Sequence, residues 1–472
     1  MRTLGNGTGG WRRRDLLKAG MAPAILRGAA DPKRPNILLI LADDQRWDTL
    51  GCMGNPIIQT PHIDRLARDG VVFDNNFVTT AICCSSRASI FTGLHERSNG
   101  IADFTTHFHE ADRPNTYYNL LRRAGYRTGF AGKFGVGTEM PAGDFDYWRG
   151  FPGQGNSENV RNGKPIHMTQ ILTEDTLEFL DTNKSDQPFC FSLSPKAAHA
   201  DDPEPRQFIP EPDLMALYES VRIPHPAGFG IDAASSLPPF LRAADTEMRL
   251  RFMKRFDTEE RFQSMVKNYY RLVSGLDRMT GRLVRRLEER GLADNTVILY
   301  TSDNGFFLGE RGMADKWMMY EPSIRTPLVI HDPRRRQGAR RREVTLNIDL
   351  APTMLELAGV EAPPHLQGRS LLPLMRSAGG WPRREFFYEH HFTKGVVIPR
   401  CEGVRTEDWK YTRYLDAQPM YEELYHLARD PNEASNMARA DEARAGQMRT
   451  RWRRWTEALA GWRRGARWQD PS

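Results

Sequence analysis

The 472-residue chain has no long apolar run, few cysteines and almost no charge excess beyond its first thirty residues. Its longest strongly apolar run, Ile37–Ala42, has 6 residues, whereas a membrane-spanning helix needs roughly 20. The five cysteines are odd in number and show no repeated spacing, which argues against a disulfide framework. Hydrophobic residues at 39% and charged residues at 27% are typical of a globular enzyme. The sequence therefore predicts a globular chain with no membrane span.

The net charge of +6 is concentrated at the N-terminus. Residues 1–30 hold six basic side chains and one acidic, or +5, which leaves 60 basic against 59 acidic in the rest. Nucleic-acid binders usually carry a basic excess in their folded part, so no nucleic-acid partner is expected. Three local clusters of basic residues remain: Arg334–Arg336, Arg340–Arg342 and the segment from Arg449 to Trp468. We interpret them as solvent-exposed faces rather than as sites that bind an anionic polymer.

The N-terminal segment matches the twin-arginine export pattern. Arg13 and Arg14 precede the hydrophobic pair Leu16-Leu17 and then Lys18. A weakly apolar stretch follows, and small residues at 28–30 suit a signal peptidase. We expect residues 1–30 to be a signal peptide and the folded chain to be exported, to the periplasm or beyond. The alternative is a basic N-terminal tail without a targeting role.

Continuous apolar runs bounded by polar residues are typical of strands buried on both faces. Asn36–Ala42 is such a run, and Asp43-Asp44 follows it; Thr296–Thr301 is another, and Ser302-Asp303-Asn304-Gly305 follows. With helical patterns between the runs, residues 31–382 are predicted to form an α/β domain with a large, mainly parallel or mixed sheet between helices. Further strands are expected at Arg127–Ala131, Phe189–Leu193 and Pro327–Ile330, and helices at Ile63–Arg68, Thr116–Ala124 and 259–290.

Residues 383–472 differ in character and are predicted to form a smaller C-terminal subdomain. Its aromatic and β-branched segments with close turns favour an antiparallel sheet, followed by a terminal helix from Asp441 to Ala460. Within it, Tyr388–His391 and Arg400–Arg405 are either ordinary strand and loop or a polar subsite for a sugar. The expected strands are Phe386–His391, Val396–Ile398, Gly403–Arg405 and Trp409–Leu415.

Two pairs of residues with side-chain oxygens, Asp43-Asp44 and Asp303-Asn304, predict a metal site. Open α/β sheets bind their ligands at the carboxyl ends of the strands, where Asp43, Asp44, Asp303 and Asn304 are expected. Hard oxygen ligands of this kind suit Ca²⁺ or Mg²⁺ rather than zinc. Each pair alone is typical of a helix cap or turn. Both pairs together, each after a buried strand, favour a metal.

Cys83 stands just before an expected helix that runs to about Glu96. A helix start attracts anions through its free N–H groups and its dipole. Arg87, one turn further on, can present a bidentate fork to the same anion. The spacing indicates an anion-binding helix start with an activated cysteine. The alternative is a buried cysteine beside a surface arginine.

With these segments in order, the sequence resembles the formylglycine-dependent type I sulfatases of the alkaline-phosphatase-like superfamily. The resemblance covers nearly all of the chain after residue 30. The matching pieces are 34–45, 60–67, Cys83–Gly93, Gly132-Lys133, 301–310, Asp315–Trp317, Asp349–Thr353, Gln367–Arg369, and 423–425 with Asp430-Pro431.

The resemblance implies a role for each matching residue. Cys83 matches the cysteine that is oxidised to formylglycine, with a formylglycine-generating enzyme as maturation partner, and Cys84 is expected to remain a thiol. Asp43, Asp44, Asp303 and Asn304 match the ligands of a metal, usually calcium, which the modified Cys83 also contacts. The remaining matches are Arg87 and Lys133, which orient the hydrated aldehyde, Lys316, which holds the sulfate, and His199 near the leaving group.

The resemblance further implies two-step nucleophilic hydrolysis of a sulfate ester. One hydroxyl of the hydrated aldehyde attacks sulfur; loss of the other's proton then expels sulfate, while the metal and Lys316 stabilise the sulfate oxygens and His199 protonates the leaving oxygen. A sulfated carbohydrate is the expected substrate. Two alternatives remain: a phosphonate monoester or phosphodiester hydrolase of the same superfamily, and a non-catalytic binding protein with unmodified Cys83.

Two positions depart from the family pattern. Ser85 stands where the family has proline, two residues after the modified cysteine. Gly135 stands where the family has the histidine assigned to the elimination step. His107, His109 or a water are the candidates to replace that histidine, and the role stays unassigned.

Overall fold

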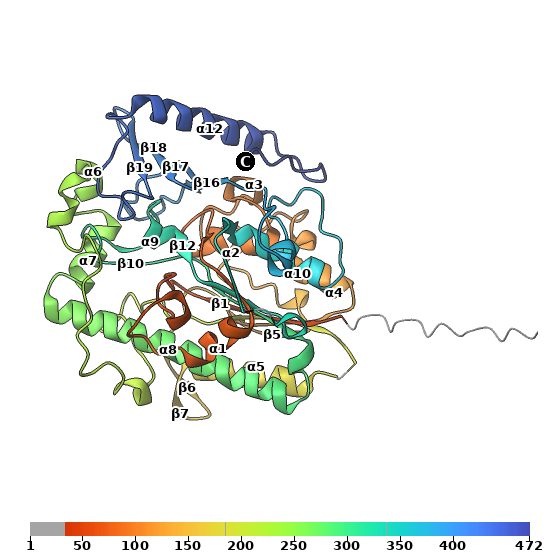
Figure 1. The fold of residues 1–472 in the computed structure, drawn as a ribbon. Coiled ribbons are helices and arrows are strands. Elements are labelled where there is room, and N and C mark those ends of the chain that lie inside the picture. Colours follow the sequence, from red (N-terminus) through yellow and green to blue (C-terminus); the bar gives the residue numbers. More distant parts are fainter. Residues whose placement is uncertain (1–33, 185, 337) are drawn as a thin grey trace, which may run out of the picture. The chain divides into compact units, whose positions relative to one another are not determined.

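The computed structural model describes residues 34–184, 186–336 and 338–472, and Arg34–Ser472 forms one compact unit. The predicted signal segment, residues 1–30, lies outside the described residues. The largest sheet has eight strands (Figure 1). Their order is β14 (Ala339–Arg341), β2 (Val71–Phe73), β13 (Leu328–His331), β9 (Thr296–Ser302), β1 (Asn36–Ala42), β8 (Phe189–Ser194), β4 (Arg127–Lys133) and β5 (Tyr147–Phe151).

Five neighbouring strands of this sheet, β9, β1, β8, β4 and β5, are parallel. β13 then runs antiparallel to β9 and to β2. All seven residues of β1 and of β9 are buried, as continuous apolar runs require in a sheet covered on both faces. The α/β fold class with a mainly parallel, mixed sheet is confirmed.

Helices cover both faces of the sheet (Figure 1). Alternate residues of β1 belong to two separate cores: Leu38 and Ile40 pack on one side, Ile37 and Leu39 on the other, as the period of two in a strand dictates. One side has α1 (Pro61–Asp69), α5 (Met168–Thr182) and α8 (Glu259–Glu289); the other has α2 (Cys83–Thr92), α4 (Tyr117–Arg123) and α10 (Leu350–Leu357).

A second, antiparallel sheet lies in the C-terminal part and has its own small apolar core with α12 (Glu442–Ala460). The expected strand at Val396–Ile398 is wrong, because that segment is a loop. One strand was missed, β19. The boundary at residue 382 stays a prediction. The strands are β16 (Glu385–His390), β17 (Cys401–Thr406), β18 (Trp409–Tyr414) and β19 (Tyr421–His426).

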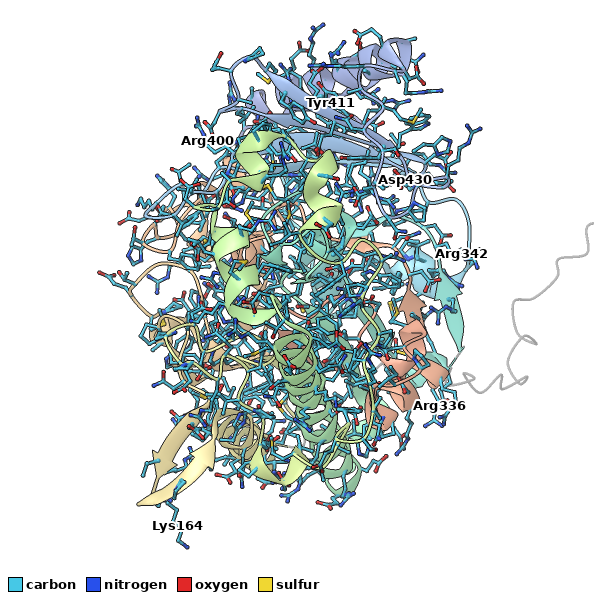
Figure 2. The ribbon with its side chains drawn as sticks, turned by 90° about the vertical axis from the view of Figure 1, so that its left-hand side faces the viewer. Lys164, Arg336, Arg342, Arg400, Tyr411 and Asp430 are labelled. Carbon is cyan, nitrogen blue, oxygen red and sulfur yellow. The ribbon has the colours of Figure 1, made fainter. Side chains whose placement is uncertain are left out.

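The remaining elements are short. Figure 2 shows Lys164 at the tip of a projecting hairpin, which β6 (Glu158–Arg161) and β7 (Lys164–His167) form. It also shows Arg336 and Arg342, from two of the basic clusters, pointing outward. No described helix is long and apolar enough to cross a membrane. The remaining short helices and strands are α3 (Glu96–Asn99), α6 (Pro239–Arg242), α7 (Glu247–Arg255), α9 (Glu321–Ile324), α11 (Leu372–Arg376), β3 (Asn76–Phe77), β6 (Glu158–Arg161), β7 (Lys164–His167), β10 (Phe307–Leu308), β11 (Ala314–Asp315), β12 (Arg325–Thr326) and β15 (Thr345–Leu346).

Candidate active site

The register of β1 and β9 brings the pairs Asp43-Asp44 and Asp303-Asn304 together. Ala42 lies opposite Ser302, so the residues that follow each strand meet at one edge of the sheet. The backbone N–H of Asp44 donates to Asp303 Oδ1 at 3.1 Å, and Asn304 Nδ2 donates to Asp44 Oδ1 at 2.5 Å. Asp43, Asp44, Asp303 and Asn304 are all buried.

This concentration of buried oxygen atoms fits a hard divalent cation. Burial raises the pKa of Asp44 to about 7, and the neighbouring carboxylates also raise it, while the positive charge of Lys316 lowers it. Burial and the charge of Asp43 likewise raise the pKa of Asp303. Asn304 Oδ1 is buried and has no hydrogen-bond partner among the described residues. A Ca²⁺ or Mg²⁺ ion would satisfy this oxygen and offset the repulsion between the carboxylates.

Cys83 is the first residue of α2, and its thiol faces this group. Its Sγ lies 3.5 Å from Asp43 Oδ1 and 3.3 Å from Lys316 Nζ. Asp43, Asp44, Cys83 and His199 each place one ligand atom within 4.8 Å of the others. Burial and Asp43 raise the pKa of the Cys83 thiol well above its usual value. In this environment the unmodified thiol stays protonated and is a weak nucleophile, and the activated cysteine stays a prediction.

Arg87 and Lys133 reach the same point from α2 and β4. Arg87 Nε donates to Asp303 Oδ2 at 2.8 Å, and the Arg87 guanidinium also donates to the Lys133 carbonyl at 2.7 Å and to Ser194 Oγ. Lys133 Nζ donates to Asp43 Oδ2 at 2.6 Å. Burial disfavours the charge of Asp43, but Lys133 and the surrounding cations hold its pKa well below the usual range. The alternative of a surface arginine is wrong, because Arg87 is fully buried.

Lys316 and His199 complete the predicted set. Lys316 follows β11 and forms an ion pair with Asp44. His199 Nε2 lies 3.5 Å from Asp44 Oδ2, while its Nδ1 lies 2.6 Å from the Ala200 carbonyl oxygen, which fixes the orientation of the ring. Burial lowers the pKa of His199 well below its usual value, with Asp43 opposing. The structure thus brings all nine predicted site residues together.

Sequence reasoning missed Gln154 and Ser194. Gln154 Oε1 accepts a hydrogen bond from Lys133 Nζ at 2.5 Å. Ser194 Oγ contacts Arg87 and donates to the Lys133 carbonyl at 2.8 Å. The serine ends β8, so its place at the strand end was the available signal. The glutamine lies in a loop after β5 and belongs to no motif.

A cavity of about 160 Å³ opens beside Cys83. Its polar lining includes Gln154, His199, Asp315 and Lys316 together with Asp202, Glu247 and Arg251. Arg251 Nη1 lies 2.8 Å from Asp202 Oδ1, and Arg251 Nε lies 2.6 Å from Glu247 Oε1. Its apolar wall is made by Phe104, Trp317, Phe392, Val396 and Ile398.

The wall residues Phe392, Val396 and Ile398 come from the loop between β16 and β17, which the C-terminal part supplies. Tyr388–His390 lies in β16 and is buried, so the ordinary-strand interpretation is right for it. Residues 401–405 lie in β17. Neither segment lines the cavity beside Cys83, which supports ordinary strand over a sugar subsite at that cavity. The loop between them lines it instead.

An ionic network with buried carboxylates and half-buried cations fixes the start of this loop. His391 Nδ1 lies 2.8 Å from Glu96 Oε1, and its Nε2 lies 3.2 Å from Glu402 Oε1. Burial opposes the charge of His391, but these hydrogen bonds raise its pKa to about 10. Arg97 bridges Glu389 and Glu402 at 2.5 and 2.6 Å. Residue 392 therefore follows an anchored position that joins α3 to the antiparallel sheet.

None of the histidines proposed to replace the one missing at Gly135 reaches the cavity. His107 is exposed and contacts Thr138 Oγ1 at 3.2 Å, and His109 Nδ1 accepts from the Ala111 N–H at 3.1 Å. Neither His107 nor His109 lines the cavity with Cys83. The two histidines are therefore wrong candidates, and a water is the candidate that remains.

Restoring the family histidine by Gly135→His should lower kcat by about tenfold or more. Gly135 has φ +77°, and a Cβ there would lie 2.6 Å from Arg87 Cδ. A non-glycine residue in this conformation costs about 1–2 kcal/mol, and the contact would push Arg87 away from Asp303. The control is Gly143→Ala, because Gly143 has open space around it. Steady-state kinetics with a sulfate ester measures the effect, and a gain in kcat for Gly135→His would contradict this account.

Comparison with known proteins agrees with this geometry. The family model described as Sulfatase matches residues 35–360, and the model described as N-sulphoglucosamine sulphohydrolase, C-terminal, matches residues 309–456. An N-acetylglucosamine-6-O-sulfatase of Bacteroides thetaiotaomicron is 30% identical, over 88% of this chain and 86% of its own. The human N-acetylglucosamine-6-sulfatase is 28% identical, over 92% of this chain and 87% of its own.

Solved structures share the fold. A protein solved in complex with its substrate D-glucosamine-2-N,6-O-disulfate has a TM-score of 0.76 and 27% identity, covering 91% of this chain and 99% of that chain. A phosphonate monoester hydrolase of Agrobacterium radiobacter has a TM-score of 0.74 at 24% identity, covering 91% and 96%, a likeness of fold alone. Since one family model spans more than two thirds of the chain and its characteristic residues converge beside one cavity, the chain belongs to the sulfatase family, whose members are sulfuric ester hydrolases.

Proposed function

We propose that the protein removes a sulfate ester from an amino sugar of a sulfated carbohydrate, at position 6 of a glucosamine-type residue. The observation that carries the reaction type is the convergence of Cys83, Arg87, Lys133 and Lys316 on the oxygen cluster at the ends of β1 and β9. The names of two full-length relatives, both N-acetylglucosamine 6-sulfatases, support the sugar and the position.

The size of the cavity supports a single sugar residue. At about 160 Å³ it is smaller than the roughly 300–1,000 Å³ of ordinary small-molecule sites. A sulfate on the exocyclic O6 can enter such a cavity while the ring stays at the mouth. Arg251, held by carboxylates through Nε and Nη1, keeps its Nη2 for a sugar hydroxyl. The apolar wall suits the face of the ring.

Formylglycine made from Cys83 and a divalent cation, Ca²⁺ or Mg²⁺, complete the proposed centre. The aldehyde hydrate would supply the nucleophilic oxygen and the cation would act as Lewis acid toward the sulfate oxygens. Asp43, Asp44, Asp303 and Asn304, with the modified residue 83, would hold the cation. A formylglycine-generating enzyme is the maturation partner this proposal requires.

The side chains around that centre have separate roles. Lys133 and Arg87 orient residue 83, and Lys316 donates to a sulfate oxygen from its position 3.3 Å from Sγ. His199 lies on the leaving-group side and lines the cavity. The negative charge of a bound sulfate ester favours the imidazolium form, which can then protonate the departing oxygen.

Treatment with a chelator should abolish turnover of N-acetylglucosamine 6-sulfate, and Ca²⁺ or Mg²⁺ should restore it. Without a cation the buried carboxylates repel one another and the sulfate oxygens lose their Lewis acid. Sulfate release is measured before and after metal return, and metal content by elemental analysis. Full activity of the chelated, metal-free enzyme would contradict the proposal.

Two further measurements, relative turnover of two substrates and mass spectrometry of the Cys83 peptide, separate the alternatives. A phosphonate monoester or phosphodiester hydrolase would turn over an aryl phosphodiester faster than the sugar sulfate. A non-catalytic binding protein would show an unmodified thiol in the peptide that contains Cys83. We expect preference for the sugar sulfate and an aldehyde at residue 83.

We further infer export through the twin-arginine route, from Arg13-Arg14 and the residues that follow. That route carries folded proteins, so conversion of Cys83 would precede export. A fusion of residues 1–30 to a reporter that requires this route should reach the periplasm, and Arg13→Lys with Arg14→Lys should retain it in the cytoplasm.

A further inference from the structure

The positive charge of the described chain lies in its last segment. Residues 442–472 hold eight arginines against Glu442, Glu457 and Asp470, a net charge of +5. The whole chain sums to +6 and residues 1–33 to +5, so residues 34–472 sum to +1 and residues 34–441 to −4. A cationic segment on an otherwise anionic body is a concentrated field rather than a general property of the surface.

Four of these arginines anchor the segment. Arg449 pairs with Glu422 at 2.7 Å, Arg454 pairs with Glu385 at 2.6 Å, and Arg451 also pairs with Glu385. Beyond α12, Arg464 pairs with Asp112 at 2.6 Å. The segment therefore has a fixed path, along the antiparallel sheet (Figure 1) and on to the loop before α4.

Three other arginines are exposed and form no ion pair with the described residues: Arg453, Arg463 and Arg467. Arg463 donates only to the backbone carbonyls of Ala460 and Trp462, at 2.9 and 2.7 Å. Partly exposed tryptophans alternate with them, and two are tied to the body: Trp462 Nε1 donates to the His365 carbonyl at 3.0 Å, and the Trp468 N–H donates to the Pro364 carbonyl at 2.9 Å.

We propose that residues 442–472 form a second binding surface, for the chain of a sulfated polysaccharide. The inference rests on the proposed function, because the substrate class supplies the partner. A guanidinium fork matches a sulfate group as it matches a carboxylate or phosphate, and the partly exposed edges of Trp462 and Trp468 add apolar area beside these arginines. None of residues 442–472 lines the cavity at Cys83. The surface holds the polymer while one of its sulfated residues enters that cavity, which raises the effective concentration of substrate.

The test compares two triple variants with equal loss of charge. Arg453→Ser/Arg463→Ser/Arg467→Ser removes the three cations named above. Arg123→Ser/Arg285→Ser/Arg335→Ser removes three exposed arginines elsewhere that likewise form no ion pair within the described part of the chain. The probe for binding is heparin, with hyaluronan as an unsulfated polyanion and duplex DNA as a second sulfur-free polyanion. Circular dichroism and Tm verify the fold of each variant.

The first variant should bind heparin about tenfold more weakly, because three exposed charge contacts are lost. The slope of log Kd against log salt should also fall by about 2. The control variant should bind as the unmodified protein does. Equal losses in both variants, or equal affinity of the unmodified protein for heparin, hyaluronan and DNA, would overturn the proposal.

Turnover of the monosaccharide N-acetylglucosamine 6-sulfate separates this inference from the proposed function. Both variants should keep its kcat and KM, because the cavity is untouched. If the monosaccharide is not hydrolysed while heparin binding still depends on the three arginines, the proposed function fails and the surface stands. If the monosaccharide is hydrolysed and heparin binding does not depend on the three arginines, the proposed binding surface is wrong and the proposed function stands.

Discussion

Replacement of Cys83 by alanine should lower kcat by about four orders of magnitude or more, the scale of loss seen when a nucleophile is removed from a working site. The fold should survive, with a change in unfolding free energy within about 1 kcal/mol, because one sulfur atom at the start of α2 is lost. Activity is measured with the sugar sulfate, stability by denaturant unfolding.

The neighbouring cysteine provides the matched control. Cys84 is fully buried in the apolar core on the other side of the helix start, and burial raises the pKa of its thiol to about 12. Cys84→Ala should therefore keep most of the activity. Mass spectrometry of the peptide should show the aldehyde at residue 83 and a thiol at residue 84. The reverse pattern, or an active Cys83→Ala enzyme, would refute the assignment.

Asp303→Asn should reduce kcat by more than the roughly 10²-fold that loss of a ligand's outer partner costs at a metal site. The change keeps the shape of the side chain but removes a charge that serves two purposes. Asp303 is a candidate metal ligand, and its Oδ2 lies 2.8 Å from Arg87 Nε. The content of bound divalent metal and kcat should therefore fall together, and an excess of the cation that activates the unmodified enzyme should restore part of the activity.

Stability provides a second readout for Asp303→Asn. Removing one partner of a buried ion pair costs about 3–5 kcal/mol, which Asp43, 3.5 Å from Arg87, will partly offset. The control is Asp277→Asn: this buried carboxyl accepts the Ile63 N–H at 2.7 Å, does not line the cavity at Cys83, and has its pKa raised to about 7 by burial. It should leave kcat unchanged. An Asp303→Asn enzyme with a full content of divalent metal and full kcat would exclude Asp303 as a site residue.

The strands and their terminal acids could be predicted because both follow from local rules. A buried run such as Asn36–Ala42 has no polar face, and the residue after it emerges at the edge of the sheet. The end of α2 carried a local signal that the prediction did not use. Gly93 has φ +69° and its N–H donates to the Ser89 carbonyl, the usual glycine stop, so α2 ends at Thr92 and the expected end at Glu96 is wrong.

Other positions could not be read because only long-range contacts define them. Gln154 reaches Lys133 because Phe151 of β5 lies opposite Lys133 of β4, a pairing that no motif announces. The segment Val396–Ile398 has the composition of a strand. It stays a loop because Val396 and Ile398 line the cavity and the Val397 carbonyl accepts the N–H of Glu247 in α7, so the segment pairs with no described strand. β-Propensity reflects such surroundings as much as the backbone.

The loop between β16 and β17 lines the cavity but contributes none of the nine residues gathered around Cys83. Its wall positions, Phe392, Val396 and Ile398, are apolar, and the ionic network around His391 anchors the point where it begins. Sequence change within this loop can therefore reshape the mouth of the cavity without altering any charge that acts on the sulfate. The enzyme can acquire a new substrate by drift in one short segment while its chemistry stays constant.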